Sequence, residues 1–180
     1  MCHYITLTTD CPDVVALAAA MARNGRNAKP QSNPSIHRLI QKGERQYLTS
    51  GVCDCGTVLG QGAERATPDD ISKVVARKKK SGWSKAKIDR WLADRGRAHA
   101  RPGQQLDSFE LWANIVADVL KLPNTSTAGL VVHFYDGQVD EETFTLNRRE
   151  VRAGTDVSLA LKQLREDELL IVHRSPKGAG

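Results

Sequence analysis

The sequence predicts a single α+β domain in which helices cover a mixed or antiparallel sheet of roughly five strands. Segments typical of strands lie near both ends of the chain, and three segments with helical spacing and capping residues lie together in the middle. With 180 residues and 40% hydrophobic composition, the chain can bury one core of ordinary size. We expect residues 1–174 to form the domain, with 67–121 as a helical layer or insertion and 175–180 as a flexible tail.

The N-terminal third predicts a strand, a helix, a short helix and a second strand. Residues 3–9 alternate and contain β-favouring Tyr, Ile and Thr, whereas residues 13–24 follow a Pro-containing turn and end before a glycine. A polar loop with two prolines should lead to a short helix over residues 35–41. The second strand is expected over residues 46–51, before a glycine-rich stretch.

Three helices are predicted in the middle of the chain, and each has its own starting signal. The first, over residues 68–80, begins with a Thr-Pro-Asp-Asp sequence, and the second begins after Ser84 and ends near Gly96. The third follows Asp107, which is expected to form a capping box with Glu110. Its apolar residues recur every three or four positions, so we expect it to be the most buried of the three.

The C-terminal third predicts a hairpin, a short helix and a last strand. Residues 130–135 are apolar on both faces, and the Asp-Gly pair at 136–137 favours a two-residue turn. Residues 138–146 should therefore return as the antiparallel partner. A short helix is expected over residues 156–164, and residues 169–173 form a final apolar run typical of a strand.

Four cysteines in a chain without an export signal favour free thiols in a reducing compartment. The longest apolar run covers nine residues, 14–22, whereas a membrane-spanning helix needs about 20. The first ten residues lack the basic and apolar regions of a signal peptide. We therefore expect a cytoplasmic protein that does not insert into membranes and has no structural disulfides.

Strand pairing predicts that three of the cysteines meet at one site. The strands over 3–9 and 46–51 can pair in antiparallel fashion, so that the start of the first lies beside the end of the second. This pairing brings Cys2 next to Cys53 and Cys55. Three thiolates suit a zinc-type ion, which prefers four ligands in a tetrahedron. The sequence therefore predicts a zinc-type site formed by these three cysteines.

The fourth ligand of such a site is left open between a neutral histidine and water. His3 is adjacent to Cys2, but neighbouring residues of a strand point to opposite faces, which counts against it. Cys11 lies nine residues beyond Cys2, about 30 Å along an extended strand, which is too far. Inert packed thiols and a reactive or redox-active thiol are the alternatives to a metal site.

A second hypothesis is an enzyme with an N-terminal cysteine. Removal of Met1 would place a thiol and an α-amino group on Cys2, which could then act as a nucleophile with its own amine as general base. The start of the chain, Met1-Cys2 followed by a strand, looks like the start of the N-terminal-nucleophile glutamine amidotransferases. The resemblance covers these first positions and implies amide-bond or amidotransfer chemistry at Cys2, while the family's downstream Asn-Gly and Gly-Asp elements are not found in matching context. Asp54 is a candidate for orienting the base.

A basic segment over residues 73–101 contains eleven Lys or Arg and two acids, a net charge of +9 in a chain whose total is +5. Charge that is segregated in this way creates a local positive field. The cations nearest the turn between the first two predicted helices are Arg77, Lys78, Lys79, Lys80, Lys85, Lys87 and Arg90. We expect them to engage an acidic protein surface; nucleic acid and a merely solvated helical face are the alternatives.

These patterns favour a small cytoplasmic binding or regulatory protein with a cysteine-based zinc-type site and a basic helical surface for an acidic partner. A Cys2 amidohydrolase or amidotransferase is the alternative, and a nucleic-acid-binding module is the third hypothesis. Histidines in the apolar strands, such as His133, are interpreted as hydrogen-bonded core residues rather than as catalytic bases.

Overall fold

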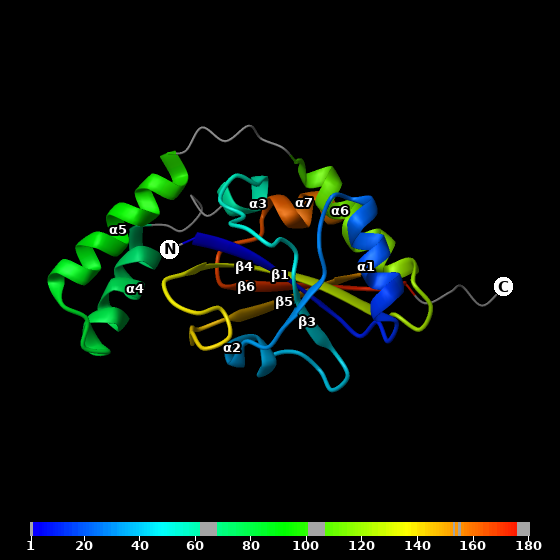
Figure 1. The fold of residues 1–180 in the computed structure, drawn as a ribbon, viewed down its shortest axis with the longest axis horizontal. Helices are drawn as coiled ribbons and strands as arrows, with labels where there is room; N and C mark the ends of the chain where they lie inside the picture. Colours follow the sequence, from blue (N-terminus) through cyan, green and yellow to red (C-terminus); the bar gives the residue numbers. More distant parts are fainter. Residues whose placement is uncertain (1, 62–67, 101–106, 153, 155, 176–180) are drawn as a thin grey trace.

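The computed structural model describes residues 2–61, 68–100, 107–152, 154 and 156–175 of the chain. The described residues form one six-stranded mixed sheet covered by helices, so the predicted α+β class is confirmed (Figure 1). The strands are β1 (Cys2–Thr9), β2 (Lys29–Gln31), β3 (Arg45–Leu48), β4 (Thr127–Tyr135), β5 (Asn147–Arg152) and β6 (Glu168–His173). The helices are α1 (Val14–Arg23), α2 (Pro34–His37), α3 (Val58–Gln61), α4 (Pro68–Lys80), α5 (Lys85–Ala100), α6 (Phe109–Lys121) and α7 (Val157–Lys162).

The strands follow the order β2-β3-β1-β4-β6-β5 across the sheet. β5 runs parallel to β6, whereas the other neighbouring strands are antiparallel. All nine residues of β4 are buried, because β4 lies between β1 and β6 and both faces of the sheet are covered at this point. The run that the sequence showed as apolar on both faces is therefore a central strand.

Helices and loops cover the two faces of the sheet unequally. α1, α6 and α7 lie along one face, where Leu130 and Trp112 belong to the larger apolar core. The neighbouring residue Val131 points to the opposite face and packs with Ile171 and with Ile36 of α2. Because successive side chains of a strand point to opposite faces, β4 contributes to the apolar clusters on both sides of the sheet.

The predicted third helix, α6, is buried along one side as expected, but its cap differs from the prediction. The N-cap is Ser108, whose hydroxyl accepts the N–H of Leu111 at 3.2 Å, so the capping role predicted for Asp107 is wrong. The Asp107 carboxylate instead accepts the N–H of Val58 at 2.8 Å and the indole N–H of Trp112 at 2.7 Å. Because the Asp107 carboxylate already forms these two tertiary hydrogen bonds, the hydroxyl of the neighbouring Ser108 caps the helix instead.

The predicted hairpin after β4 is wrong. Residues 138–146 form a loop in which the Glu142 carboxylate accepts the N–H groups of Asp136 at 2.8 Å and Gly137 at 3.0 Å. With these turn amides bound to a side chain, the chain does not return along β4. The alternating residues Phe144 and Leu146 instead pack over the α2 face of the sheet, and the next strand, β5, pairs with β6.

Three short elements, β2, α3 and β5, carry no clear sequence signal. β2 and β5 are the two edge strands of the sheet, which explains the proline in one and the polar Asn-Arg-Arg-Glu-Val-Arg sequence of the other. α3 is a four-residue helix after the glycine-rich stretch. The Thr that precedes α4 and residues 176–180 of the predicted tail lie outside the described residues.

α4 and α5 form a helical hairpin beside the end of the sheet at which β1 begins (Figure 1). Ile88 and Trp91 of α5 are buried, and the Trp91 ring meets Phe134 of β4 edge-on with the ring centroids 6.2 Å apart. This contact fixes the hairpin next to the cysteines. Within the described part of the chain, no helix has the length and apolar character needed to cross a membrane.

Candidate metal centre

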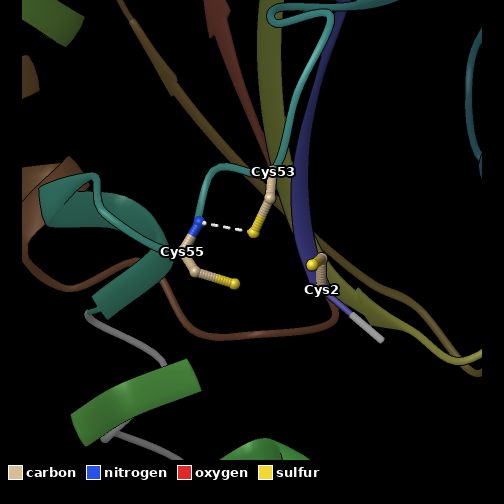
Figure 2. A group of neighbouring side chains, drawn as sticks. All are labelled: Cys2, Cys53 and Cys55. Atoms are coloured by element: carbon tan, nitrogen blue, oxygen red, sulfur yellow. Dashed lines mark hydrogen bonds between the residues drawn. The ribbon is translucent and has the colours of Figure 1, made fainter. Parts of the chain in front are cut away.

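The three predicted cysteines come together where β1 begins (Figure 2). Beyond β3 the chain continues alongside β1, and the Asp54 N–H donates to the His3 carbonyl at 2.8 Å. The sulfur atoms of Cys2, Cys53 and Cys55 lie within 4.8 Å of one another. The predicted juxtaposition is therefore confirmed, and we call these three residues the thiol cluster.

Backbone N–H groups donate to two of the three sulfur atoms. The His3 N–H donates to Cys55 Sγ at 3.2 Å, and the Cys55 N–H donates to Cys53 Sγ at 3.3 Å, the contact dashed in Figure 2. Such donors favour negative charge on sulfur, and hydrogen bonds of this kind support the ligands of many metal centres. The loop over residues 53–55 is thus folded in a way that suits thiolates.

Hydrogen bonds among the sulfur atoms favour one thiolate, at Cys55. The hydrogen bond with Cys53 lowers the pKa of Cys55, and the His3 amide adds to this effect while burial opposes it. The same hydrogen bond, together with burial, raises the pKa of Cys53. Burial also raises the pKa of Cys2. Of the three thiols, the most buried one, Cys55, is therefore the one that loses its proton most readily.

The thiol cluster is covered by apolar side chains on one side and accessible on the other. Cys55 is only 4% exposed and packs with Trp91 and Phe134, whereas Cys2 and Cys53 are half-buried. Further apolar cover comes from Ile71, Val74, Val75 and Trp83 of the α4–α5 hairpin. An ion can reach the two half-buried sulfurs from solvent and would then lie against a surface of low polarity.

His3 lies closer to the cluster than strand alternation suggests. It does not belong to the group of mutually close ligand atoms found among the described residues, in keeping with its position on the other face of β1. Its Nδ1 nevertheless lies 3.7 Å from Cys55 Sγ, and its Nε2 lies 3.6 Å from Glu166 Oε2. His3 therefore borders one ligand of the cluster and connects it to a buried carboxylate.

Asp54 is engaged away from the cysteines. Its buried carboxylate accepts the N–H of Ile5 at 2.9 Å and pairs with Arg26 at 3.0 Å. Burial raises the pKa of Asp54 to about 6, although the Ile5 amide and Arg26 both favour the charged form. Arg26 also binds Asp107 at 2.6 Å, so it joins two acids that lie far apart in the sequence. The contacts of the described residues thus give Asp54 a positioning role in the fold and do not connect its carboxylate to Cys2.

Six of the seven cations in the predicted partner surface are exposed on the α4–α5 hairpin: Arg77, Lys79, Lys80, Lys85, Lys87 and Arg90. Lys78 is different, because its ammonium group pairs with Asp136 and lies 4.0 Å from the ring centroid of Trp83 and 5.0 Å from that of Trp91. Lys78 therefore attaches the hairpin to the sheet end. We call the six exposed cations the basic surface.

A second cluster of ionisable groups lies near the thiol cluster, and the sequence patterns did not reveal it. His133 Nδ1 lies 2.5 Å from Asp167 Oδ1, and His133 Nε2 lies 3.4 Å from Glu142 Oε1. The imidazole is buried and stacks on Phe144 with the ring centroids 3.6 Å apart. Burial alone would lower the pKa of His133, but the two carboxylates outweigh it and raise the pKa to about 9. We call His133, Glu142 and Asp167 the histidine–carboxylate cluster.

Comparisons of the chain with models of known protein families, with curated proteins and with solved structures give no match.

Proposed function

We propose that the protein is a small binding or regulatory protein whose thiol cluster holds a zinc-type ion. The observation that carries this proposal is the approach of Cys2, Cys53 and Cys55 sulfur atoms to within 4.8 Å of one another, with backbone N–H donors on two of them. Sulfur is the ligand that zinc and other thiophilic ions prefer, and three such ligands occupy three corners of a tetrahedron. Water or His3 Nδ1 would complete it.

A metal ion at this position would connect two segments that are remote in the chain. Cys2 lies at the start of β1, whereas Cys53 and Cys55 lie in the loop after β3. Because the unfolded chain does not hold these three residues together, the free energy of metal binding would contribute directly to folding. The proposed ion therefore has a structural role, and the thiolate at Cys55 would be its first ligand.

Metal analysis of protein purified without added zinc tests the site. We expect about one thiophilic ion per chain in the wild type and at least tenfold less in Cys53→Ser, since a hydroxyl is a poor zinc ligand. Cys11→Ser is the matched control, because Cys11 is a buried cysteine outside the cluster whose Sγ lies 3.4 Å from the Asp13 carbonyl, a contact that serine can keep. A metal-free wild type, or equal loss of metal in both variants, would contradict the proposal.

The basic surface supports the second part of the proposal, an acidic protein partner. Six exposed cations gather around one helical turn, while the rest of the chain, residues 73–101 aside, is acidic. Such a surface attracts a negatively charged partner. The acidic remainder of the chain repels that partner only weakly when it approaches at the hairpin. Nucleic acid would offer the same sign of charge, so it is the competing outcome of the binding test.

Binding to poly-glutamate and to a single-stranded oligonucleotide, each measured against salt concentration, tests this surface. We expect stronger binding to poly-glutamate, and loss of that binding in the double variant Lys79→Glu/Lys80→Glu. The double variant Lys42→Glu/Lys121→Glu changes the charge by the same amount at exposed sites outside the hairpin and should bind as the wild type does. Preference for the oligonucleotide would favour the nucleic-acid hypothesis, and binding to neither would contradict both.

A further inference from the structure

A cavity of about 620 Å³ lies between the α4–α5 hairpin and the end of the sheet. Its walls come from both helices of the hairpin, from the start of β5, and from the segment 163–168 that leads into β6. Ile71, Val74 and Trp91 supply apolar surface, and the same three side chains belong to the apolar cluster that contains Cys55. The volume falls in the range of sites for small organic molecules.

Each acidic side chain that the structure describes in the lining already has a cationic partner. The pairs and their nitrogen–oxygen distances are Glu166 with Arg95 at 2.9 Å, Asp167 with His133 at 2.5 Å, and Glu168 with Arg149 at 2.9 Å. His133 counts as a cation at neutral pH, because its pKa is about 9. These pairs leave no unbalanced negative charge among the described residues of the cavity wall.

Two guanidinium groups of the lining remain without an acid. Arg77 of α4 and Arg165 of the segment before β6 are both exposed, and neither forms an ion pair with another described residue. Arginine presents a planar group that binds carboxylates and phosphates through two parallel hydrogen bonds. The described wall of the cavity therefore has a positive charge that an anionic ligand would neutralise.

Trp91 adds a hydrogen-bond donor without an acceptor. Its side chain is 2% exposed, and its indole Nε1 is buried with no hydrogen-bond partner among the described residues. A buried N–H without an acceptor is rare in folded proteins and unfavourable. Trp91 also lines the cavity, and an oxygen atom of a bound molecule that reached this nitrogen would satisfy the donor.

We propose that this cavity binds a small organic anion. Its carboxylate or phosphate group would be held by Arg77 and Arg165, and its flat apolar body would lie against Trp91, Ile71 and Val74. The inference is independent of the metal site, since none of the three cysteines lines the cavity.

Titration with 1-anilinonaphthalene-8-sulfonate tests the proposal, because this dye is a flat organic anion whose fluorescence rises in apolar surroundings. We expect saturable binding to the wild-type protein and about tenfold weaker binding to Arg77→Gln, as for the loss of one charge-assisted hydrogen bond. Arg23→Gln is the matched control: it removes the same charge from an exposed position of α1 outside both the lining and the basic surface, and it should change the Kd by less than twofold. Absence of saturable binding, unchanged binding in Arg77→Gln or an equal loss in Arg23→Gln would each overturn the proposal.

Two further measurements define the ligand. Trp91→Phe keeps one aromatic ring and removes the N–H together with part of the apolar ring surface, so we expect at least about threefold weaker dye binding with an unchanged circular dichroism spectrum; unchanged affinity in a folded variant would overturn the role of the indole donor. Competition by phenyl phosphate and by phenylacetate then distinguishes the two acidic groups. Displacement of the dye by either compound supports the proposal and identifies the preferred group, and displacement by neither overturns it.

Discussion

Two clusters of ionisable side chains at the same end of the sheet differ in how their charge is balanced. The thiol cluster consists of soft ligands, and among the described residues its sulfur atoms receive backbone N–H groups but no hydrogen bond from a lysine or an arginine. The histidine–carboxylate cluster holds an imidazolium between Asp167 and Glu142. The strand register places them close together, since Cys2 pairs with Tyr135 two residues from His133.

Geometry alone does not separate a metal site from an internal ion pair. The ligand atoms of His133, Glu166 and Asp167 also lie within 4.8 Å of one another, as the three sulfur atoms do. Glu166 is already paired with Arg95 and Asp167 with His133, so a metal ion would have to displace cations that the protein itself provides. Acids that already face cations of the protein take part in internal ion pairs, whereas soft ligands without a cation provide a site for one.

Removal of the proposed metal ion should produce the largest difference between the two clusters. A chelator is expected to lower the Tm of the wild type by about 10 to 15 °C, because loss of a structural ion removes several kcal/mol at about 2 to 4 °C per kcal/mol for a chain of this size. Cys53→Ser should already have the lower Tm without chelator, and the chelator should not change it. The Tm of His133→Gln should fall with chelator as that of the wild type does. Differential scanning calorimetry measures all three. A chelator effect that persists in Cys53→Ser would indicate that the metal binds outside the thiol cluster.

Asp167→Asn should show that the histidine–carboxylate cluster acts on stability rather than on metal content. Asp167 has a φ of 61°, a conformation that asparagine also tolerates, so the substitution removes the charge and leaves the backbone unstrained. We expect the free energy of unfolding to fall by about 3 kcal/mol, since the buried His133 loses a partner. Urea denaturation gives this value, with the exposed Asp89→Asn as a control that changes little. A loss of metal in Asp167→Asn would mean that the two clusters form one site.

The pH dependence of stability should also distinguish the clusters. The pKa of His133 is about 9 in the folded protein and about 6.5 when unfolded, so the folded state binds the proton more tightly. Its stabilising contribution is complete below pH 6.5 and is lost as the pH rises through 9, which amounts to about 2 kcal/mol between pH 7.5 and 10. The difference in unfolding free energy between the wild type and His133→Gln should therefore narrow over this range. A difference that stays constant up to pH 10 would indicate a neutral His133.

The thiol cluster could be predicted from the sequence because it depends on two local features and one pairing rule. Alternation and β-favouring residues predicted the strand that begins near Cys2, a second strand was expected before the glycine-rich stretch, and an antiparallel ladder brings such ends together. The burial of α6 and the apolar character of both faces of β4 were predictable for a similar reason, since each follows from the pattern of apolar residues in a continuous segment.

The histidine–carboxylate cluster could not be predicted, because its members lie in segments whose local sequence either gives no structural indication or indicates the wrong structure. An Asp-Gly pair after an apolar strand predicts a hairpin, yet here the Glu142 carboxylate binds both turn amides and also reaches His133. Asp167 adopts a left-handed conformation just before β6. Hydrogen bonds from backbone groups to side chains elsewhere in the chain can override turn propensity. Such tertiary hydrogen bonds cannot be read from a single sequence.

The smallest effect expected concerns two adjacent lysines of α4 that the sequence does not distinguish. Lys78 is paired with Asp136 and lies over two tryptophan rings, with both charged side chains about 15% exposed, whereas Lys79 is in solvent. Lys78→Gln should lower the free energy of unfolding by about 1 kcal/mol, since a partly buried ion pair and its cation–π contacts are lost, and Lys79→Gln should change it by less than about 0.5 kcal/mol. Urea denaturation of the two variants under identical conditions makes the comparison. Equal effects would show that the ion pair of Lys78 does not stabilise the attachment of the hairpin. Stabilisation by internal ion pairs would then apply to His133 and not to Lys78.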